Sequence, residues 1–222
     1  MFSILKQAIF NGQFDFFLIL SYLCSAVVVV FISSPVHEYA HAMTAVKLGD
    51  PTPKYTGRTT LNPLAHIDYI GALLIFLFGF GWAKPVQVNP RYFKNPKRDM
   101  AVTALAGPVS NVLLGFVFYV FYKLLGYAPS TAPIYYVTFF CLQVVYINIT
   151  LAVFNLIPIP PLDGSRLLSA CLSDRTYYRL MQYERYFSWG IILLLFTGVL
   201  DYPMFYLRKL LLFFYGLLTF WF

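Results

Sequence analysis

The sequence predicts an all-α polytopic membrane protein, and three observations lead to this fold class. Hydrophobic residues make up 59% of the 222-residue chain, whereas charged residues make up only 11%. The mean hydropathy is +0.68, and a soluble domain of this length cannot bury that much apolar surface. The apolar residues also gather in runs long enough to cross a bilayer. We expect one integral membrane domain over residues 1–222, with about five transmembrane helices.

The first apolar run predicts one long helix over residues 14–48. Its N-terminal part has the length of a transmembrane span, and Pro35 predicts a kink near its middle. Gly49-Asp50-Pro51 is expected to end the helix, because proline cannot continue it. Residues 1–13 lack the apolar core and the cleavage site of a secretory signal, so we expect this span to be retained.

The next three segments do not have the pattern of transmembrane helices. Residues 54–68 are polar and contain β-branched and aromatic side chains, which predicts a small strand or hairpin on the membrane surface. Residues 70–82 are apolar but too few for a simple span, so we expect a short re-entrant segment. Residues 84–98 form the most basic stretch and contain three prolines, which indicates an extended cytoplasmic loop.

Four further apolar helices are expected, over residues 101–125, 134–157, 186–200 and 204–222. The second and third of these are separated by a break at Pro158, Pro160 and Pro161. Backbone that is not helical at membrane depth lines a cavity or packs on protein. Asp163 lies at this break, and a new helix is expected to begin near Gly164.

The charge pattern predicts the orientation of the chain in the membrane. The net charge is +7, but the basic residues lie between apolar runs, which indicates membrane-face loops and not nucleic-acid binding. If residues 70–82 are re-entrant, the end of the first helix and the proline break lie on the same, cytoplasmic side. We therefore expect a multi-pass protein of the cell membrane with its N-terminus outside. The three cysteines have no metal-ligand or disulfide spacing.

The motif His37-Glu38-Tyr39-Ala40-His41 follows the first apolar run. On a helix, His37 and His41 lie one turn apart on the same face, which allows two imidazoles to share one zinc ion. Glu38 is placed beside them to act as a general base on water. Ionisable residues in membrane helices are usually functional, so we favour a metal site over histidines that only pack within a helix bundle.

A catalytic zinc takes three protein ligands and keeps one position open, so a third ligand is needed. The candidates are His66, Asp68, Asp99 and Asp163. Asp163 is favoured by its place at the proline break, although an aspartate there also suits the N-cap of the following helix. His66 is the next candidate, and its alternative is a polar loop residue that is hydrogen-bonded to Asn62 or Asp68.

Several short motifs occur in a fixed order within residues 20–170. They are His37-Glu38-Tyr39-Ala40-His41, Gly57-Arg58 with Leu61-Asn62-Pro63, Gly81-Trp82-Ala83-Lys84-Pro85-Val86, Ala106-Gly107-Pro108 with Asn111, and Asn155 through Gly164. Together they resemble the site-2 protease family of intramembrane zinc metalloproteases, peptidase family M50. The resemblance is to short prokaryotic members that lack PDZ and CBS domains.

The resemblance implies a role for each matching residue. His37, His41 and Asp163 would bind one Zn²⁺ per chain, and Glu38 would be catalytic. Asn155 would lie near the site and help to hold the substrate backbone or the oxyanion. His66 matches a recurrent histidine and is a further candidate for contact with substrate.

The function implied is zinc-dependent endopeptidase activity in or near the transmembrane segments of membrane proteins. The catalytic core would cover about residues 14–172, followed by the two C-terminal helices. The partners would be a transmembrane protein or peptide substrate and membrane lipid, and the oligomeric state is left open. The alternative is a zinc-binding scaffold or transporter without catalysis. Glu38 favours the enzyme, because a structural zinc site does not need a carboxylate beside its first ligand.

Overall fold

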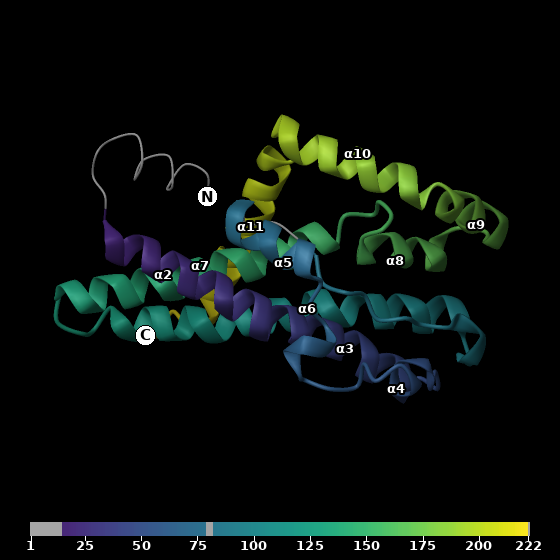
Figure 1. The fold of residues 1–222 in the computed structure, drawn as a ribbon, viewed down its shortest axis with the longest axis horizontal. Coiled ribbons are helices and arrows are strands. Elements are labelled where there is room, and N and C mark those ends of the chain that lie inside the picture. The colour runs from purple at the N-terminus through teal and green to yellow at the C-terminus, as the bar shows by residue number, and fades with distance from the viewer. Residues whose placement is uncertain (1–14, 79–81, 222) are drawn as a thin grey trace.

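A computed structural model describes residues 15–78 and 82–221 of the chain. Within these ranges the protein is mostly helical and contains no strand. Among the described residues, three helices are long and apolar enough to cross a membrane: Phe16–Lys47, Pro96–Leu125 and Ala132–Asn155. These three pack on one another and form the centre of the molecule (Figure 1).

The first of these helices has three parts, which are α2 (Phe16–Val28), the π-helical turn η1 (Val29–Ser33) and α3 (Ser34–Lys47). Asp15 caps its start, because its carboxylate accepts a hydrogen bond from the Leu18 N–H at 3.0 Å. The π-helical turn lies just before Pro35, where the missing N–H and the ring disturb the helical ladder. Gly49 follows the helix with φ +112°. The predicted long helix and its irregularity near Pro35 are therefore present.

The segment after α3 differs from the prediction. It contains the helical turn α4 (Thr52–Tyr55) and the short 3-10 helix η2 (Pro63–Ala65), so the expected strand or hairpin over residues 54–68 is wrong. Pro53 lies in the helical turn, and Gly57 reverses the chain with φ +67°. The strand-favouring side chains between these turns have no partner strand, and an isolated strand is not stable.

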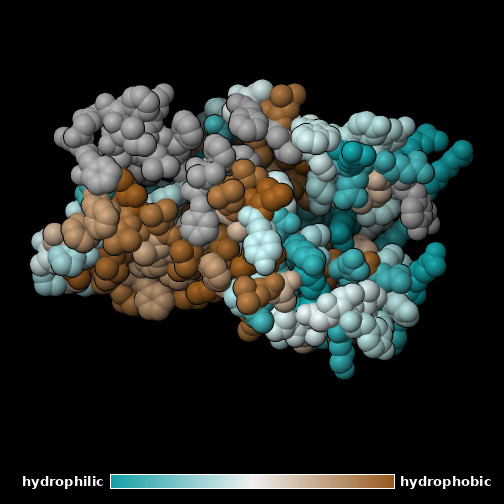
Figure 2. Space-filling model, viewed as in Figure 1, coloured by the Kyte–Doolittle hydropathy of each residue, from teal (hydrophilic) through white to brown (hydrophobic). Residues whose placement is uncertain are grey.

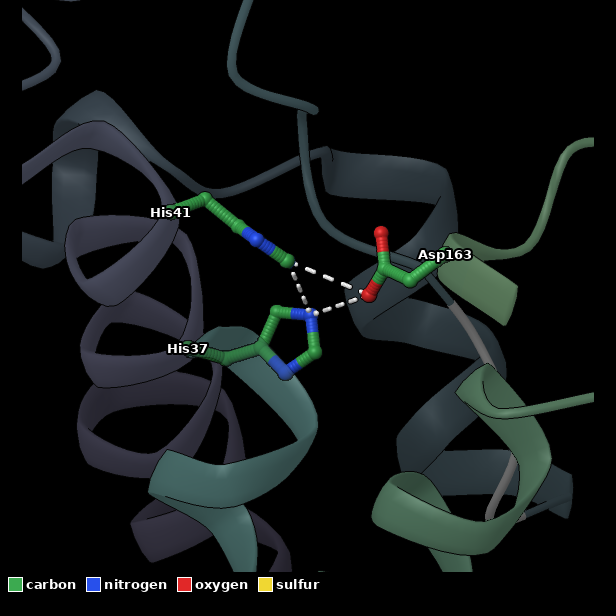
Figure 3. Close-up of side chains that lie close together, drawn as sticks. All are labelled: His37, His41 and Asp163. Carbon is green, nitrogen blue, oxygen red and sulfur yellow. Dashed lines mark hydrogen bonds and ion pairs between the residues drawn. The ribbon is translucent and has the colours of Figure 1, made fainter. Parts of the chain in front are cut away.

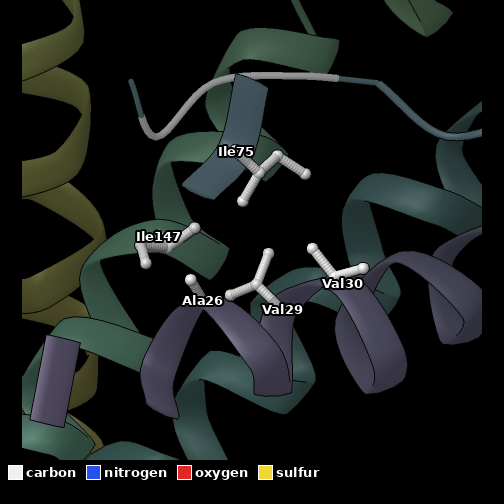
Figure 4. Packing of buried hydrophobic residues seen from close by; sticks show 5 residues of the cluster. All are labelled: Ala26, Val29, Val30, Ile75 and Ile147. Atoms are coloured by element: carbon white, nitrogen blue, oxygen red, sulfur yellow. The ribbon is translucent and has the colours of Figure 1, made fainter. Parts of the chain in front are cut away.

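Helix α5 (Tyr69–Phe78) accounts for most of the segment that was expected to be re-entrant. Its 10 residues give a length of about 15 Å, which is half the thickness of the hydrocarbon core. The segment before α5 contacts the segment after it, because the Lys84 N–H donates to the His66 carbonyl at 2.8 Å. Ile75 of α5 packs against Ala26, Val29, Val30 and Ile147 (Figure 4). Residues 79–81 lie outside the described part.

The remaining helices are α6 (Pro96–Leu125), α7 (Ala132–Asn155), α8 (Asp163–Cys171), α9 (Asp174–Gln182), α10 (Glu184–Thr197) and α11 (Asp201–Leu218). Before α6 the basic segment is irregular, with the 3-10 turn η3 (Pro90–Tyr92). Helix α6 begins before residue 101, where the sequence placed it, because Pro96 suits the first turn of a helix. Helix α8 follows the proline break, as predicted.

The expected number of five transmembrane helices is larger than the described residues support. Helix α10 has only 14 residues, a length of about 21 Å. Helix α11 contains Asp201, Arg208 and Lys209 within its 18 residues, whereas each spanning helix has an apolar stretch of 18 residues with at most two charged side chains. It packs beside α7 through Met204 and Tyr215, which join a cluster of buried side chains with Val145, Ile149 and Val153.

The surface of the molecule is divided into an apolar and a polar end. Figure 2 shows hydrophobic residues over α2, the C-terminal part of α6 and the start of α7. Hydrophilic residues cover the opposite end, over α4, α8 and α9. Such a division is expected for a protein with one part in the bilayer and one part at its polar face.

Candidate metal centre

Helix α3 carries the two histidines and the glutamate of the motif on neighbouring positions of its buried side. His37, Glu38 and His41 are each less than one tenth exposed, at 8%, 8% and 7%. Because the histidines are four residues apart, their rings meet edge to face with 4.7 Å between the centroids. The Nε2 atoms of the two imidazoles lie 3.0 Å apart.

Asp163 reaches the two histidines from the first turn of α8. Its Oδ2 lies 3.2 Å from Nε2 of His37 and 3.1 Å from Nε2 of His41 (Figure 3). The residue in the N-cap position of α8 is Leu162, so the N-cap alternative for Asp163 does not hold. The proline break therefore turns the chain so that a carboxylate far along the sequence faces α3.

These three side chains fit a zinc ion. Among the described residues, they are the one group of three or more His, Cys, Asp or Glu side chains close enough to share a metal. Two imidazole nitrogens and a carboxylate oxygen are a common catalytic zinc set, and ligands of a tetrahedral zinc lie about 3.3 Å from one another. Burial would raise the pKa of Asp163, but His41 and His37 lower it well below its usual range, so the carboxylate is ionised.

One face of helix α6 contacts the two imidazoles through Thr103, Gly107 and Asn111, which follow one another at intervals of four residues. Nδ1 of His41 donates to the Thr103 carbonyl at 2.7 Å, and the Asn111 amide lies 3.1 Å from Nδ1 of His37. Gly107 leaves the space that the rings fill, because a Cβ there would overlap Nε2 of His41. Such contacts orient metal-binding histidines and fix their tautomers.

The sequence alone did not predict these contacts of Thr103, Gly107 and Asn111. The signal was present in the Ala106-Gly107-Pro108 motif and in the four-residue spacing. The contacts could not be predicted without knowing which face of α6 packs on α3.

Glu38 lies beside the three side chains and makes a contact of its own. Its Oε2 accepts a hydrogen bond from the Val86 N–H at 3.0 Å. Val86 belongs to the irregular segment between α5 and α6, so a loop far along the sequence reaches the glutamate. The carboxylate is thus buried, close to the histidines and held by a backbone donor.

The other candidate ligands lie elsewhere. His66 is fully buried, and its Nε2 donates to the Thr60 carbonyl at 2.8 Å, so it belongs to neither the ligand cluster nor an open substrate surface. Asp68 accepts hydrogen bonds from the N–H groups of Ile70 and Gly71 at the start of α5. Asp99 accepts one from Asn95 at the start of α6. The structure thus gives these three residues local structural contacts.

Asn155 lies at the end of α7, just before the proline break that leads to Asp163. Its amide donates to the Leu151 carbonyl at 3.0 Å, and the side chain is partly buried. Among the described residues it makes no hydrogen bond to the histidine–aspartate cluster.

The helices and the site together define a helical membrane protein with a buried site suited to catalytic zinc. Comparison with known proteins agrees. The model of peptidase family M50 matches residues 125–197, which include Asp163. "Putative zinc metalloprotease YwhC" of Bacillus subtilis is 38% identical over 171 residues, which cover 75% of this chain and 78% of the relative.

Two more distant relatives carry similar names. "Putative zinc metalloprotease Rip2" of Mycolicibacterium smegmatis is 28% identical over 82% of this chain and 71% of its own length. "Putative zinc metalloprotease MJ0611" of Methanocaldococcus jannaschii is 32% identical over 62% of this chain and 61% of its own length. No solved structure matches the chain significantly.

The chain belongs to peptidase family M50, the site-2 protease family. It is a metalloendopeptidase with zinc as its cofactor.

Proposed function

We propose that His37, His41 and Asp163 bind the catalytic zinc and that Glu38 is the general base for hydrolysis of peptide bonds in or near transmembrane segments. One observation carries this proposal: three ligand atoms from α3 and α8 lie within 3.2 Å of one another, beside a buried glutamate. The family supplies the peptidase chemistry, and the geometry supports these residues for it.

Zinc held at this site would polarise the scissile carbonyl and activate water. The chain's own residues prepare the reaction. Glu38, as a carboxylate, accepts the proton of the attacking water and passes it to the leaving amine. Thr103 and Asn111 hold the two imidazoles with Nε2 facing the site.

The length of the first helix supports a site near one face of the membrane. His37 lies about 32 Å along the helix from Phe16, which is close to the thickness of the hydrocarbon core. A peptide bond in a substrate helix is hydrogen-bonded and hidden, so the substrate segment must unwind before it reaches Glu38. A site near the polar face suits segments that unwind there.

The basic loops support a cytoplasmic side for the site in the cell membrane. Many of the basic residues lie in two ranges, residues 84–98, which lead into α6, and residues 166–185, which run from α8 through α9 to the start of α10. The contact between Lys84 and His66 returns the chain to the start of α5, as expected if the segment dips into the membrane and comes back. The N-terminus would then lie outside.

We also propose that Asn155 binds the backbone of the substrate. It lies eight positions before Asp163, at the end of α7, where the helix gives way to the proline break. An amide there supplies both a donor and an acceptor to an extended peptide.

The test is cleavage of a model single-span membrane protein by the purified, zinc-loaded chain in lipid. We expect Glu38→Gln to keep one zinc per chain and to lose at least a hundredfold in kcat, because proton transfer by a side chain contributes about 10² to 10⁴. Glu184→Gln is the matched control, since Glu184 lies in the first turn of α10. Cleavage by Glu38→Gln at the wild-type rate would contradict the proposal.

A further inference from the structure

The contact between Val86 and Glu38 depends on a segment that has no regular secondary structure. We call residues 84–89 the strap, because they cross beside Glu38 between α5 and α6. No strand ladder holds the Val86 N–H in place within the described residues. Pro85 restricts the chain but donates no hydrogen bond. The Val86 side chain is itself buried, and the polar contacts that hold the strap lie at its two ends.

The upstream end is held by a turn that contains Arg58 and His66. Nη1 of Arg58 donates to the Ala65 carbonyl and lies 3.5 Å from the Lys84 carbonyl oxygen. The Lys84 N–H donates to the His66 carbonyl at 2.8 Å. One guanidinium therefore joins the turn to the first residue of the strap, two positions before Val86.

Arg58 is an unusual residue for such a place. Arg58 is only 8% exposed, and among the described residues its guanidinium forms no salt bridge with a carboxylate. Burying a guanidinium is costly unless its donors find acceptors, and here two backbone carbonyls lie within reach of Nη1. Lysine carries its charge on one nitrogen at the end of a flexible stem, so it would hold these two carbonyls less firmly than the planar guanidinium does.

The downstream end of the strap is held by Asp50, which is fully buried just after α3. Its Oδ2 accepts a hydrogen bond from the Asn89 N–H at 2.7 Å, and its Oδ1 accepts one from the Thr52 N–H at 2.9 Å. Val88 also packs against the buried cluster of Ala45, Phe93 and Met100, to which α3 contributes Ala45. This end of the strap is thus fixed to the helix that carries Glu38.

We propose that Arg58 and Asp50 are positioning residues, which hold the strap at its two ends so that the Val86 N–H orients the Glu38 carboxylate. The inference rests on the proposed role of Glu38 as the general base. The hydrogen bond restricts rotation of the carboxylate and leaves its second oxygen for the proton of water. Neither Arg58 nor Asp50 needs to touch the substrate or the zinc.

The test uses the full, zinc-loaded chain and three readouts: kcat and KM on the model substrate, zinc content, and hydrogen exchange at the Val86 amide. We expect Arg58→Met to lower kcat about ten- to a hundredfold, the effect of losing one hydrogen bond to a charged group, while KM and zinc content change less than about twofold. Exchange at Val86 should rise about tenfold or more. Arg58→Lys should recover part of the loss.

Arg91→Met is the matched control, because it removes one positive charge from an exposed position in the same loop and should leave all readouts unchanged. Asp50→Asn releases the other end of the strap and should give the same pattern, so it decides the matter if Arg58→Met does not fold. Wild-type kcat in both Arg58→Met and Asp50→Asn, or a loss of zinc in step with kcat, would overturn the inference. Exchange at Val86 tests the strap even if Glu38 proves not to be the base.

Discussion

The two imidazoles of the site owe their orientation to one face of α6. Nδ1 of His41 donates to the Thr103 carbonyl, so this ring offers Nε2 as a ligand. His37 can do the same only with its proton on Nδ1, and an amide accepts that proton only through its oxygen. The structure places Nδ2 of Asn111 against Nδ1 of His37, so zinc binding through Nε2 of His37 would require the amide to turn so that Oδ1 faces the ring.

Replacing Asn111 should weaken zinc binding without removing a ligand. We expect Asn111→Leu to lower zinc affinity about ten- to a hundredfold, because the His37 tautomer is no longer fixed. Competition with a chelator measures this. Asn148→Leu is the control, since Asn148 is a buried amide in α7 that donates to the Val144 carbonyl and not to a histidine. Equal zinc affinity in the two variants would argue against this role of Asn111.

At the scale of elements, the site depends on how closely α8 approaches the end of α7. Gly164 follows Asp163, and a Cβ there would overlap the carbonyl oxygen of Leu156 and lie 2.5 Å from that of Ile157. These are backbone atoms, so a side chain at this position must move α8. Moving α8 displaces Asp163 from the histidines.

Gly164→Ala should therefore reduce both stability and zinc binding. We expect unfolding to become easier by about 1–3 kcal/mol, the usual effect of overpacking, together with a fall in zinc affinity. Gly190→Ala in α10 is the control, because no other atom lies within 4 Å of the added Cβ. Thermal unfolding with and without zinc measures both effects. A Gly164→Ala protein with wild-type zinc affinity would show that the close approach is not needed.

The apolar runs of the sequence predicted the three long helices, because a span of this length has few alternatives in a membrane. Thr59 and Thr60 were misleading, since β propensity depends on a partner strand that the fold does not provide. The pair His37 and His41 was readable from local spacing. Asp163 required the resemblance, and the contacts of Thr103, Asn111 and Val86 depend on packing between distant segments, which spacing does not reveal.

At the scale of the whole molecule, the basic loops and the return of the chain beside α5 predict one orientation. A reporter fused before residue 15 should be active only outside the cell, whereas a reporter inserted in residues 84–98 should be active only in the cytoplasm. The reason is that positively charged loops remain on the cytoplasmic side. A cytoplasmic N-terminus would contradict the re-entrant path and the cytoplasmic site.

The central claim is that α3 and α8 together hold one zinc through His37, His41 and Asp163. X-ray absorption spectroscopy on the zinc-loaded protein tests it most directly, with Asp163→Ala as the comparison. The account predicts one zinc per chain, bound by two imidazole nitrogens and a carboxylate oxygen, with the carboxylate contribution lost in the variant. A third imidazole, or a spectrum unchanged in Asp163→Ala, would contradict it.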